Sequence, residues 1–532
     1  MRYVSTRGHP TRASFEGAIL SGYAPDGGLW VPETLPRITP AMLDLWSSSG
    51  GDNSGPITFF NIAAQVLSLF AGEEIPLATL QSITRSAFAT FDHPDAIPLV
   101  PGGLSPSDPL RLLETWHGET LAFKDIGLQA LARLIDYFLG RRGVKANIIM
   151  ETSGDTGPAA LSAAQGLDSV EMFCLYPKGR VSRVQELQLI TMPPTASNLH
   201  VYRTEGTTDD QAATIKALFG DAAFAAKYHC CSMNSINVGR IAVQSSYYVY
   251  TYLKIRKELE QRAGRGRVRD PNALTMMIDF VIPTGAFGNA CAGFWAKQMG
   301  LPIRHIRVAT NANDIVHRAI STGDFTPGRS LSTVSPAMDI QLPYNFERFL
   351  HALLGGGAEA KLRLVPLLKR HGPTGTRRLP AEIVHKIADA GVSSVSVSDD
   401  ETLSTVRRHW QDRRYCLDPH SAIGVFAAER YRDSLPDTDD CPCVAVLTAH
   451  PSKFEAATRS AIGQDAPDVP DRVLKLDAMP TAFDTRMGPP QYQDEAGAGG
   501  GGEVVGAWLE VLKADVIRAS KGGGGPAPES KL

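Results

Sequence analysis

Hydrophobic positions in the first ninety or so residues recur mainly with a helical period. Residues 14–35 read as a helix, a turn rich in Gly and Pro, and a short extended segment. Helical periodicity follows over residues 59–70 and again over 80–91. Because Pro94, Pro98 and Pro101 then interrupt the pattern, residues 1–95 are predicted to form a mostly helical N-terminal domain.

Beyond this point, short β-branched runs alternate with amphipathic helical segments. The runs cover residues 146–150, 172–176, 280–282 and 444–447, and each ends in a loop containing Gly, Ser, Thr or Pro. This alternation is typical of βαβ units in a largely parallel sheet. The predicted fold class is therefore α/β, and ligands are expected at the carboxyl ends of the strands.

The pattern weakens past about residue 467, where glycine runs occupy 499–502 and 522–525. Between the runs, five apolar residues have the spacing of one helix face: Val504, Trp508, Val511, Leu512 and Val516. Residues 466–532 are thus predicted to be a Gly-rich extension with one amphipathic helix. That helix would dock either on the body of the protein or on a second subunit, in which case the protein would be a homodimer.

Composition limits the partners. The chain has 532 residues, 43% of them hydrophobic, which suffices for a large core and two or three domains. With 53 Lys and Arg against 56 Asp and Glu, no basic excess favours nucleic acid. No apolar run is long enough to span a bilayer, and the N-terminus lacks a charged and apolar leader. We expect a cytoplasmic protein that binds neither nucleic acid nor membrane.

The cysteines give no metal site. Seven cysteines, an odd number spread widely along the chain, are typical of reduced thiols. Cys441 and Cys443 are the only tight pair with a spacer, and only His450 lies near them in the sequence. Since no second Cys or His completes a zinc-ligand set, no metal is predicted.

One lysine lies in an apolar stretch just before a predicted helix. Lys124 follows Leu121, Ala122 and Phe123, and the helix is expected to begin around Ile126. Partial desolvation would help its amine to lose a proton, as an amine that forms a Schiff base must. On this segment alone, an ordinary surface lysine is the commoner explanation.

Two segments combine glycines with the start of a predicted helix. Residues 152–160, TSGDTGPAA, place hydroxyls and backbone N–H groups at a helix N-terminus, which suits a carboxylate or phosphate. Residues 281–290, VIPTGAFGNA, let the backbone approach an anion closely. The second segment is neither a Walker loop nor a dinucleotide fingerprint. An ordinary capped turn is the alternative for both.

A fourth segment, residues 446–454 (VLTAHPSKF), places the Thr448 hydroxyl at the end of a predicted strand. His450 and Lys453 follow within the same loop. Either a structural or a phosphate-facing role suits these two residues.

Together the four segments resemble the threonine synthase family of fold-type II pyridoxal-phosphate enzymes. The resemblance runs from Tyr3 to about Ile462 and includes further motifs: STRG at 5–8, DGGL at 26–29, PKGRVS at 177–182, QE at 185–186, NSIN at 234–237, SPAMD at 335–339 and DPHSA at 418–422. It implies a tryptophan synthase β-like fold. Residues 96–465 would form two α/β domains, the smaller at about 140–245, behind a threonine synthase-type N-terminal domain.

The resemblance also implies roles by position. Lys124 matches the Schiff-base lysine, and Thr448 matches the hydroxyl that faces the ring nitrogen of pyridoxal 5′-phosphate. The loop implied to bind the cofactor phosphate contains Gly285, Ala286, Phe287, Gly288 and Asn289. The residues implied to bind substrate are Thr152, Ser153, Asp155, Thr156, Lys178, Arg180, Asn234, Ser235, Asn237 and Arg240. Of these, Lys178, Arg180 and Arg240 would suit a substrate phosphate.

The implied reaction is elimination of phosphate from O-phosphohomoserine, with O-phosphothreonine as a second candidate substrate. Addition of water at Cβ would then give threonine, whereas release without that addition would give 2-oxobutyrate and ammonia. The family usually has Asn where this chain has Ala286, and commonly Asp where it has Asn289. Loss of one amide hydrogen bond costs about 0.5–1.5 kcal/mol and should not abolish cofactor binding.

Several features favour the lyase outcome. Ala286, the opening YVSTRG and the segment SVSVSD at 394–399 resemble the animal threonine-synthase-like phospholyases. Two other functions are alternatives: a non-catalytic binding or signalling protein with the same fold, and a serine/threonine dehydratase. Retention of Lys124 and Thr448 argues against the first, and the phosphate-suited basic residues argue against the second.

Overall fold

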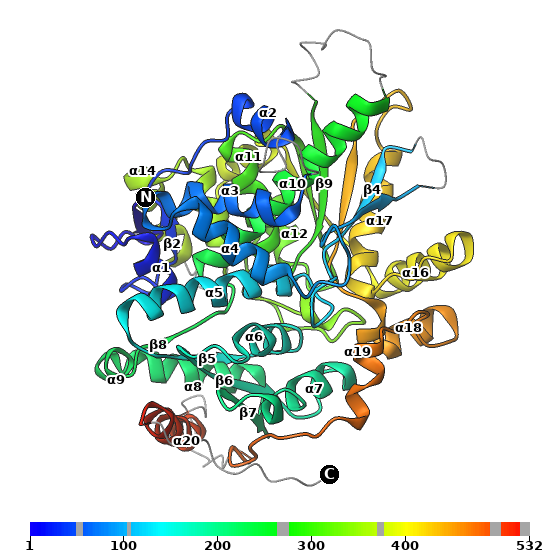
Figure 1. The fold of residues 1–532 in the computed structure, drawn as a ribbon. Helices are drawn as coiled ribbons and strands as arrows, with labels where there is room; N and C mark the ends of the chain where they lie inside the picture. The colour runs from blue at the N-terminus through cyan, green and yellow to red at the C-terminus, as the bar shows by residue number, and fades with distance from the viewer. Residues whose placement is uncertain (49–56, 104–107, 263–275, 370–376, 490–501, 522–532) are drawn as a thin grey trace.

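A computed structural model describes residues 1–48, 57–103, 108–262, 276–369, 377–489 and 502–521 (Figure 1). The N-terminal part is mostly helical around a small antiparallel sheet, in which β1 (Tyr3–Ser5) pairs with β2 (Trp30–Pro32). Its helices are α1 (Phe15–Ser21), α2 (Pro40–Ser48), α3 (Phe59–Ala71), the short 3-10 helix η1 (Gly72–Glu74) and α4 (Leu77–Phe88). The predicted helices over 59–70 and 80–91 are confirmed, whereas β1 was not predicted.

The larger of two further sheets has six strands in the order β11-β10-β9-β12-β4-β3. Five strands are parallel: β4 (Leu110–Glu114), β9 (Ile278–Pro283), β10 (Ile303–Thr310), β11 (Val392–Ser396) and β12 (Cys443–Leu447). The edge strand β3 (Leu99–Pro101) runs antiparallel to β4. Every residue of β9 and β12 is buried, as expected for parallel strands covered on both faces.

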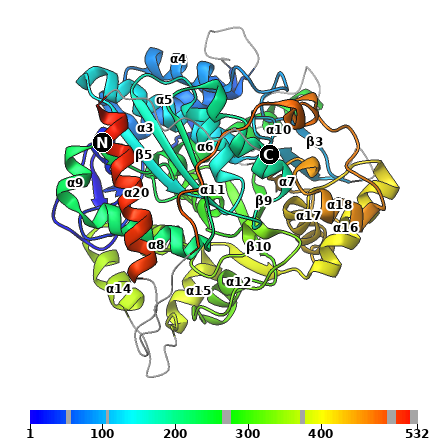
Figure 2. The same cartoon turned by 90° about the horizontal axis from the view of Figure 1, so that it is seen from below.

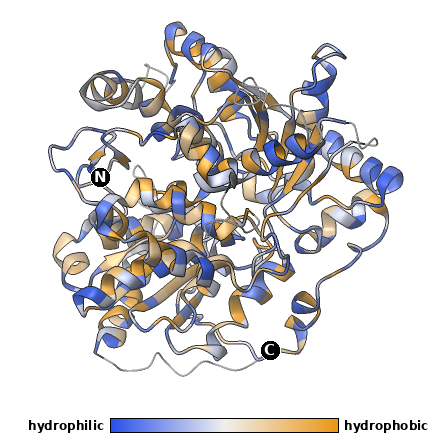
Figure 3. Cartoon of the chain, turned by 45° about the horizontal axis from the view of Figure 1, so that its top comes forward, coloured by the Kyte–Doolittle hydropathy of each residue, from blue (hydrophilic) through white to orange (hydrophobic). Residues whose placement is uncertain are grey.

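The helices that accompany this sheet follow in chain order. They are α5 (Lys124–Arg142), α10 (Val238–Arg262), α11 (Gly288–Met299), α12 (Ile315–Thr322), α13 (Phe346–Leu353), α14 (Gly357–Lys369), α15 (Ala381–Asp389), α16 (Asp399–Arg413), α17 (Pro419–Asp433) and α18 (Glu455–Ile462), with 3-10 turns η4 (Pro336–Met338) and η5 (Pro451–Lys453). The strands and the inner helix faces carry much of the hydrophobic colour in Figure 3.

The smaller sheet is entirely parallel, with the strand order β7-β6-β5-β8. Its strands are β5 (Ala146–Glu151), β6 (Val170–Pro177), β7 (Leu199–Thr204) and β8 (Cys230–Cys231). Its helices are α6 (Thr156–Ala164), α7 (Arg183–Ile190), η2 (Pro193–Thr195), α8 (Thr208–Gly220) and α9 (Ala222–Lys227). The predicted α/β fold with two largely parallel sheets is thus confirmed, while the domain boundaries at 95 and 465 stay predictions.

The C-terminal segment returns to the smaller sheet. It contains α19 (Asp471–Leu474), η6 (Leu476–Ala478) and α20 (Gly502–Ser520). Val473 and Leu476 pack against Leu121, close to the start of α5. Figure 2 shows α20, in red, lying across α8. Most of the two predicted glycine runs (499–501 and 522–525) lies outside the described residues.

The helix α20 docks on its own chain. Trp508, Leu512 and Val516 are buried in one cluster with Phe173 and Tyr202 of the smaller sheet. The Tyr202 hydroxyl also donates a hydrogen bond of 2.9 Å to the Asp515 carboxylate. The amphipathic spacing found in the sequence therefore serves packing within the chain, and the homodimer stays a prediction. Among the described residues, no helix combines the length and the apolar character that crossing a membrane requires.

Replacement of Trp508 by alanine tests this docking. Because the indole is 3% exposed and well packed, Trp508→Ala should destabilise the α20 contact by about 3–5 kcal/mol. Calorimetry should show a lower melting temperature, whereas Glu510→Ala, at an exposed position of the same helix, should leave it nearly unchanged. Equal melting of the Trp508 variant and the wild type would contradict the observed packing.

Candidate active site

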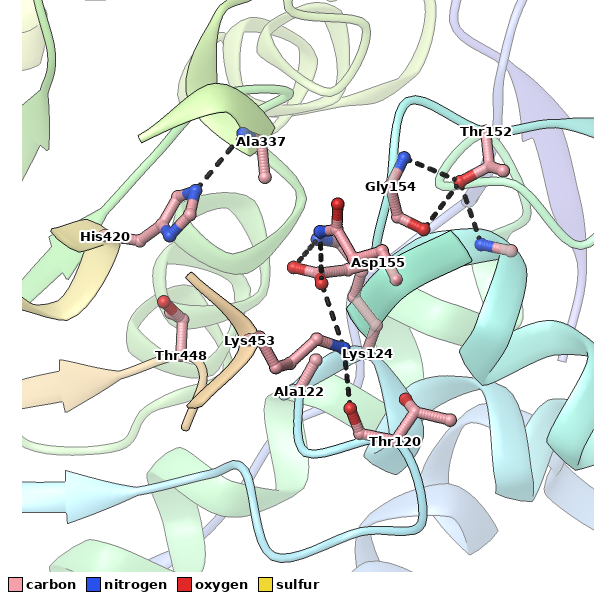
Figure 4. A network of polar contacts seen from close by, with 12 residues as sticks. Thr120, Ala122, Lys124, Thr152, Gly154, Asp155, Ala337, His420, Thr448 and Lys453 are labelled. Atoms are coloured by element: carbon pink, nitrogen blue, oxygen red, sulfur yellow. Dashed lines mark hydrogen bonds and ion pairs between the residues drawn. The ribbon is translucent and has the colours of Figure 1, made fainter. Parts of the chain in front are cut away.

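Three loops bring four polar residues together between the two larger sheets (Figure 4). Lys124 is the first residue of α5, and Asp155 precedes α6 in the turn that follows β5. Thr448 and Lys453 lie in the loop after β12. The carboxyl ends of β5 and β12 thus face the start of α5, which is the position expected for a ligand site in an α/β fold.

The loop before α5 is fastened to the loop after β12 by backbone hydrogen bonds. The Phe123 N–H donates to the Thr448 carbonyl at 2.8 Å, and the His450 N–H donates to the Leu121 carbonyl at 3.1 Å. Leu121 has a φ of 61°, in the left-handed region that residues other than glycine rarely adopt. These bonds hold Lys124 at a fixed distance from the end of β12.

The Asp155 carboxylate is shared between two lysines. Its Oδ2 lies 3.2 Å from Lys124 Nζ, and its Oδ1 lies 3.0 Å from Lys453 Nζ. Gln185 Nε2 donates a further hydrogen bond of 2.9 Å to Oδ1. Lys453 Nζ also donates to the Thr120 carbonyl at 2.6 Å. One carboxylate therefore connects the three loops of the site.

Burial and charge together set the protonation of this group. Burial lowers the pKa of Lys124, and the Asp155 charge offsets this only in part. Burial alone would raise the pKa of Asp155, but the positive charges of Lys453 and Lys124 outweigh it and hold that pKa well below its usual range. Lys124 is thus more readily deprotonated than an exposed lysine while Asp155 stays ionised.

A further buried cation lies near Lys124. Arg240 of α10 is 3% exposed, and burial lowers its pKa to about 10. Within the described part of the chain its Nε has no hydrogen-bond partner, and its charge acts on Lys124. A buried guanidinium with an unpaired N–H suits an anionic ligand.

The turn after β5 is built by its own threonine. Thr152 Oγ1 accepts hydrogen bonds from the backbone N–H groups of Gly154, at 3.1 Å, and Gly157, at 2.9 Å. A side chain at Gly154 would collide with Gln185, since a Cβ there would lie 2.7 Å from Gln185 Nε2. Ser153, by contrast, is exposed, and Thr156 is half-buried.

The glycine loop after β9 leads into α11. Gly285 has no room for a side chain, because a Cβ would lie 3.0 Å from the Met338 Cα. Phe287 precedes α11 with a φ of 65°, again in the left-handed region. Asn289 Oδ1 accepts a hydrogen bond of 2.5 Å from the Tyr248 hydroxyl, but its buried Nδ2 has no partner in the described residues. Donors of the loop are therefore available to a ligand.

These residues fit pyridoxal 5′-phosphate. Lys124 supplies a buried amine with a lowered pKa for the aldehyde. The buried Thr448 Oγ1 lacks a partner among the described residues, as expected of a hydroxyl kept for a ring nitrogen. Its position is fixed by a hydrogen bond of 2.9 Å from its own backbone N–H to Ser421 Oγ. The Asn289 amide and the N-terminus of α11 suit a phosphate.

Some predicted substrate residues lie elsewhere or have structural partners. Lys178 is exposed in an ion pair of 2.7 Å with Glu205, and Arg180 is exposed. Asn237 is buried and donates to the carbonyls of Ile19 (2.8 Å) and Ser232 (3.1 Å). It therefore anchors α1, and the predicted substrate roles of these three residues remain untested.

Two other predicted residues line the edge of β5. Asn234 Nδ2 donates to the Glu151 carboxylate at 3.0 Å. The Ser235 carbonyl accepts a hydrogen bond of 3.1 Å from Asn345 Nδ2. This edge lies beside the turn that carries Asp155, so a role in substrate binding stays a prediction for both.

Sequence reasoning gave no specific role to three residues of the site. Gln185 and Lys453 bind Asp155. His420 lies near Asp155, and its Nε2 accepts a hydrogen bond of 3.1 Å from the Ala337 N–H. Its Nδ1 therefore carries the proton and donates to Asp418 at 2.9 Å. Gln185 and His420 were part of recognisable motifs, which was the only available signal.

No group of three or more His, Cys, Asp or Glu side chains in the described ranges is arranged to hold a metal ion.

Comparison with known proteins identifies relatives over almost the whole chain. The family models "Threonine synthase N terminus", "Pyridoxal-phosphate dependent enzyme" and "Threonine synthase, C-terminal" match residues 2–88, 110–448 and 421–488. "Threonine synthase-like 2" of Homo sapiens is 37% identical over 480 residues, covering 90% of this chain and 92% of that protein. "Threonine synthase" of Schizosaccharomyces pombe is 35% identical over 509 residues, covering 91% and 92%.

A solved structure agrees with these matches. The PLP-bound threonine synthase from Brucella melitensis is 34% identical and superposes with a TM-score of 0.82, covering 98% of this chain and 100% of that chain. Cofactor and fold are therefore those that the sequence motifs predicted.

The neighbour of Lys124 provides a test of burial in the site. Asp125 is fully buried and accepts hydrogen bonds from the Thr120 hydroxyl, at 2.7 Å, and the Thr120 N–H, at 2.9 Å. Burial raises its pKa to about 6, and the bonds from Thr120 offset only part of the effect. Between about pH 4 and pH 6 the folded protein therefore binds more protons than the unfolded chain. The free energy of unfolding consequently falls as pH rises through that window.

Asp125→Asn should remove this dependence. The melting temperature of the variant relative to the wild type should rise between about pH 4.5 and pH 7, corresponding to about 2 kcal/mol. Asp471→Asn, at a highly exposed carboxylate, should show no such trend. A constant difference in melting temperature between Asp125→Asn and the wild type over this range would show that burial does not raise the pKa of Asp125.

Proposed function

Since this chain belongs to the threonine synthase family of pyridoxal-phosphate-dependent enzymes, we propose that it is a phospholyase that eliminates phosphate from O-phosphohomoserine. Substrate and one water would give 2-oxobutyrate, ammonia and phosphate. The observation that carries the proposal is Arg240, a buried guanidinium whose Nε has no hydrogen-bond partner in the described residues. A phosphate ester brings about −1.5 to −2 charges and acceptor oxygens that would pair with this group.

The cofactor is pyridoxal 5′-phosphate. We assign its aldehyde to Lys124, its ring nitrogen to Thr448 and its phosphate to the loop of residues 285–289. When bound, it withdraws electrons from the α-carbon of the amino acid. A neutral threonine hydroxyl facing the ring nitrogen leaves that nitrogen weakly protonated.

Lys124 is the proton carrier in this proposal. Its lowered pKa makes the free amine easier to form than in an exposed lysine, so it can take the proton from Cα of the substrate. Asp155 Oδ2 stabilises the ammonium group that results and keeps it directed at the reacting carbons. The same ammonium group can return a proton at Cγ after phosphate has left.

Substrate charge is met by two different features. The exposed Ser153 and the half-buried Thr156, with the N–H groups at the start of α6, suit the substrate carboxylate. Arg240, whose Nε has no partner in the described chain, suits the phosphate. O-phosphothreonine presents the same groups and is the second candidate substrate.

Threonine synthase activity is the second candidate function. The relatives from Schizosaccharomyces pombe and Brucella melitensis carry that name and match nearly the whole chain. The elimination would be the same, and water would then add at Cβ. In our proposal Ala286, where the family usually has asparagine, favours the lyase, because the smaller side chain would alter how water is positioned in the site.

The described cysteines are all free thiols, which supports a cytoplasmic location.

A product assay distinguishes the two functions. Purified holoenzyme incubated with O-phosphohomoserine should release 2-oxobutyrate in amounts equal to phosphate, with little threonine. Lys124→Ala should lower phosphate release by about 10²–10⁴-fold, because it removes the proton carrier. Lys475→Ala, at an exposed lysine, should not change it.

Each other result of this assay has a defined meaning. Threonine as the main product would replace the lyase by the synthase. Release of neither product, with either phosphorylated amino acid, would contradict both functions.

A further inference from the structure

Lys453 is a buried cation of the site that has no role in binding the cofactor or the substrate in the proposed function. Its side chain is fully buried. Its ammonium group makes two contacts, with the Thr120 carbonyl at 2.6 Å and with Asp155 Oδ1 at 3.0 Å. A buried charge is strongly destabilising without such partners, so these two contacts determine where the ammonium group lies.

The two oxygens of Asp155 have different environments. Oδ1 accepts from Gln185 and Lys453, whereas Oδ2 contacts Lys124 at 3.2 Å. The carboxylate is thus held from the side of the η5 turn and α7, and its other oxygen faces the start of α5. Its negative charge is divided between two ammonium groups at nearly equal distances.

The remaining charged groups around this pair come from other elements. Arg240 of α10 acts on Lys124. His420 of α17, a titratable ring that is neutral while its Nε2 accepts from the Ala337 N–H, lies near Asp155. Asp125 of α5 lies near Lys453, whose positive charge offsets part of the rise in the pKa of Asp125 that burial causes. Lys453 is the one among these groups that pairs directly with the same carboxylate as Lys124.

We propose that Lys453 is a positioning residue of the active site, which holds Asp155 Oδ1 and compensates its charge so that Oδ2 orients Lys124 without fixing it as an ammonium ion. The inference rests on the proposed role of Lys124 as the residue that binds the cofactor. It does not depend on which product the enzyme releases.

The consequence concerns the nitrogen of Lys124 when it carries the cofactor. Without the Lys453 charge, Asp155 would act on that nitrogen alone and favour its protonated form. The visible absorbance of bound pyridoxal phosphate depends on the protonation of this nitrogen. A pH titration of the absorbance therefore reports the charge balance at Asp155 independently of turnover.

The test is this titration on holoenzyme with Lys453→Met. The midpoint should move to higher pH by about one pH unit or more, which is a change of about tenfold in the protonation equilibrium. Lys453→Arg keeps the charge and should restore a midpoint close to that of the wild type. Lys475→Met, at an exposed lysine, should leave the midpoint unchanged.

A second background tests whether Lys453 acts through Asp155. In Asp155→Asn, addition of Lys453→Met should move the midpoint by much less than it does in the wild type. An equal movement in both backgrounds would mean that Lys453 acts directly on the cofactor nitrogen and would overturn the inference. So would an unchanged midpoint in Lys453→Met alone.

Two controls separate the causes of failure. If Lys453→Met loses its fold, as judged by circular dichroism, Lys453→Gln retains an N–H donor without the charge, and its midpoint decides instead. If the wild type shows no cofactor band, or Lys124→Ala keeps it, the proposed role of Lys124 fails. A normal cofactor band whose midpoint does not change when Lys453 is replaced contradicts only the positioning role of Lys453.

Discussion

The Asp155 carboxylate, held between two buried lysine side chains, is the interaction on which the candidate site depends. It joins the start of α5, the turn after β5 and the loop after β12 through contacts of 3.0 and 3.2 Å. Each of these charges alone would be costly to bury. Together they stabilise one another. The same carboxylate therefore organises the loops and offsets part of the effect of burial on the pKa of Lys124.

The fold brings these groups together by a simple rule. The strands of both sheets that end in the site are parallel, so their carboxyl ends meet the first turns of the following helices. Local backbone conformations then adjust the loops. Gly285 allows the chain to pass close to Met338, and Phe287 adopts a left-handed conformation just before α11. Helix N-termini supply anion-binding N–H groups without any further charge.

The positions of several candidate residues stand out in the sequence. Lys124, Thr448 and the loop of residues 285–289 each lie at the boundary of a strand or a helix, where hydrophobic periodicity changes and glycines and hydroxyls gather. The roles assigned to them came from the resemblance to the threonine synthase family, because periodicity alone left an ordinary lysine and ordinary turns as alternatives. The buried strands β5, β9 and β12 were predicted from their short apolar runs. Strands such as β11 (VSSVS) were missed, since a half-buried strand rich in serine has little apolar periodicity.

The ion pairs could not be predicted. Lys453 and Asp155 are far apart in the chain, and their contact arises only when the sheets assemble. The hydrogen bonds of Asn237 could not be predicted either. Its place in a motif suggested substrate binding, whereas its buried side chain donates to the carbonyls of Ile19 and Ser232 and so has a structural role. Lys178 was predicted from its charge, but charge alone does not show that a side chain is exposed and paired with Glu205.

The central claim is that Lys124, and not the more deeply buried Lys453, binds the cofactor. Reduction of the holoenzyme with borohydride followed by proteolysis and mass spectrometry identifies the modified lysine directly. The account predicts a phosphopyridoxyl group on the peptide that contains Lys124, with the peptide that contains Lys453 unmodified. Modification of Lys453, or of no lysine at all, would contradict it.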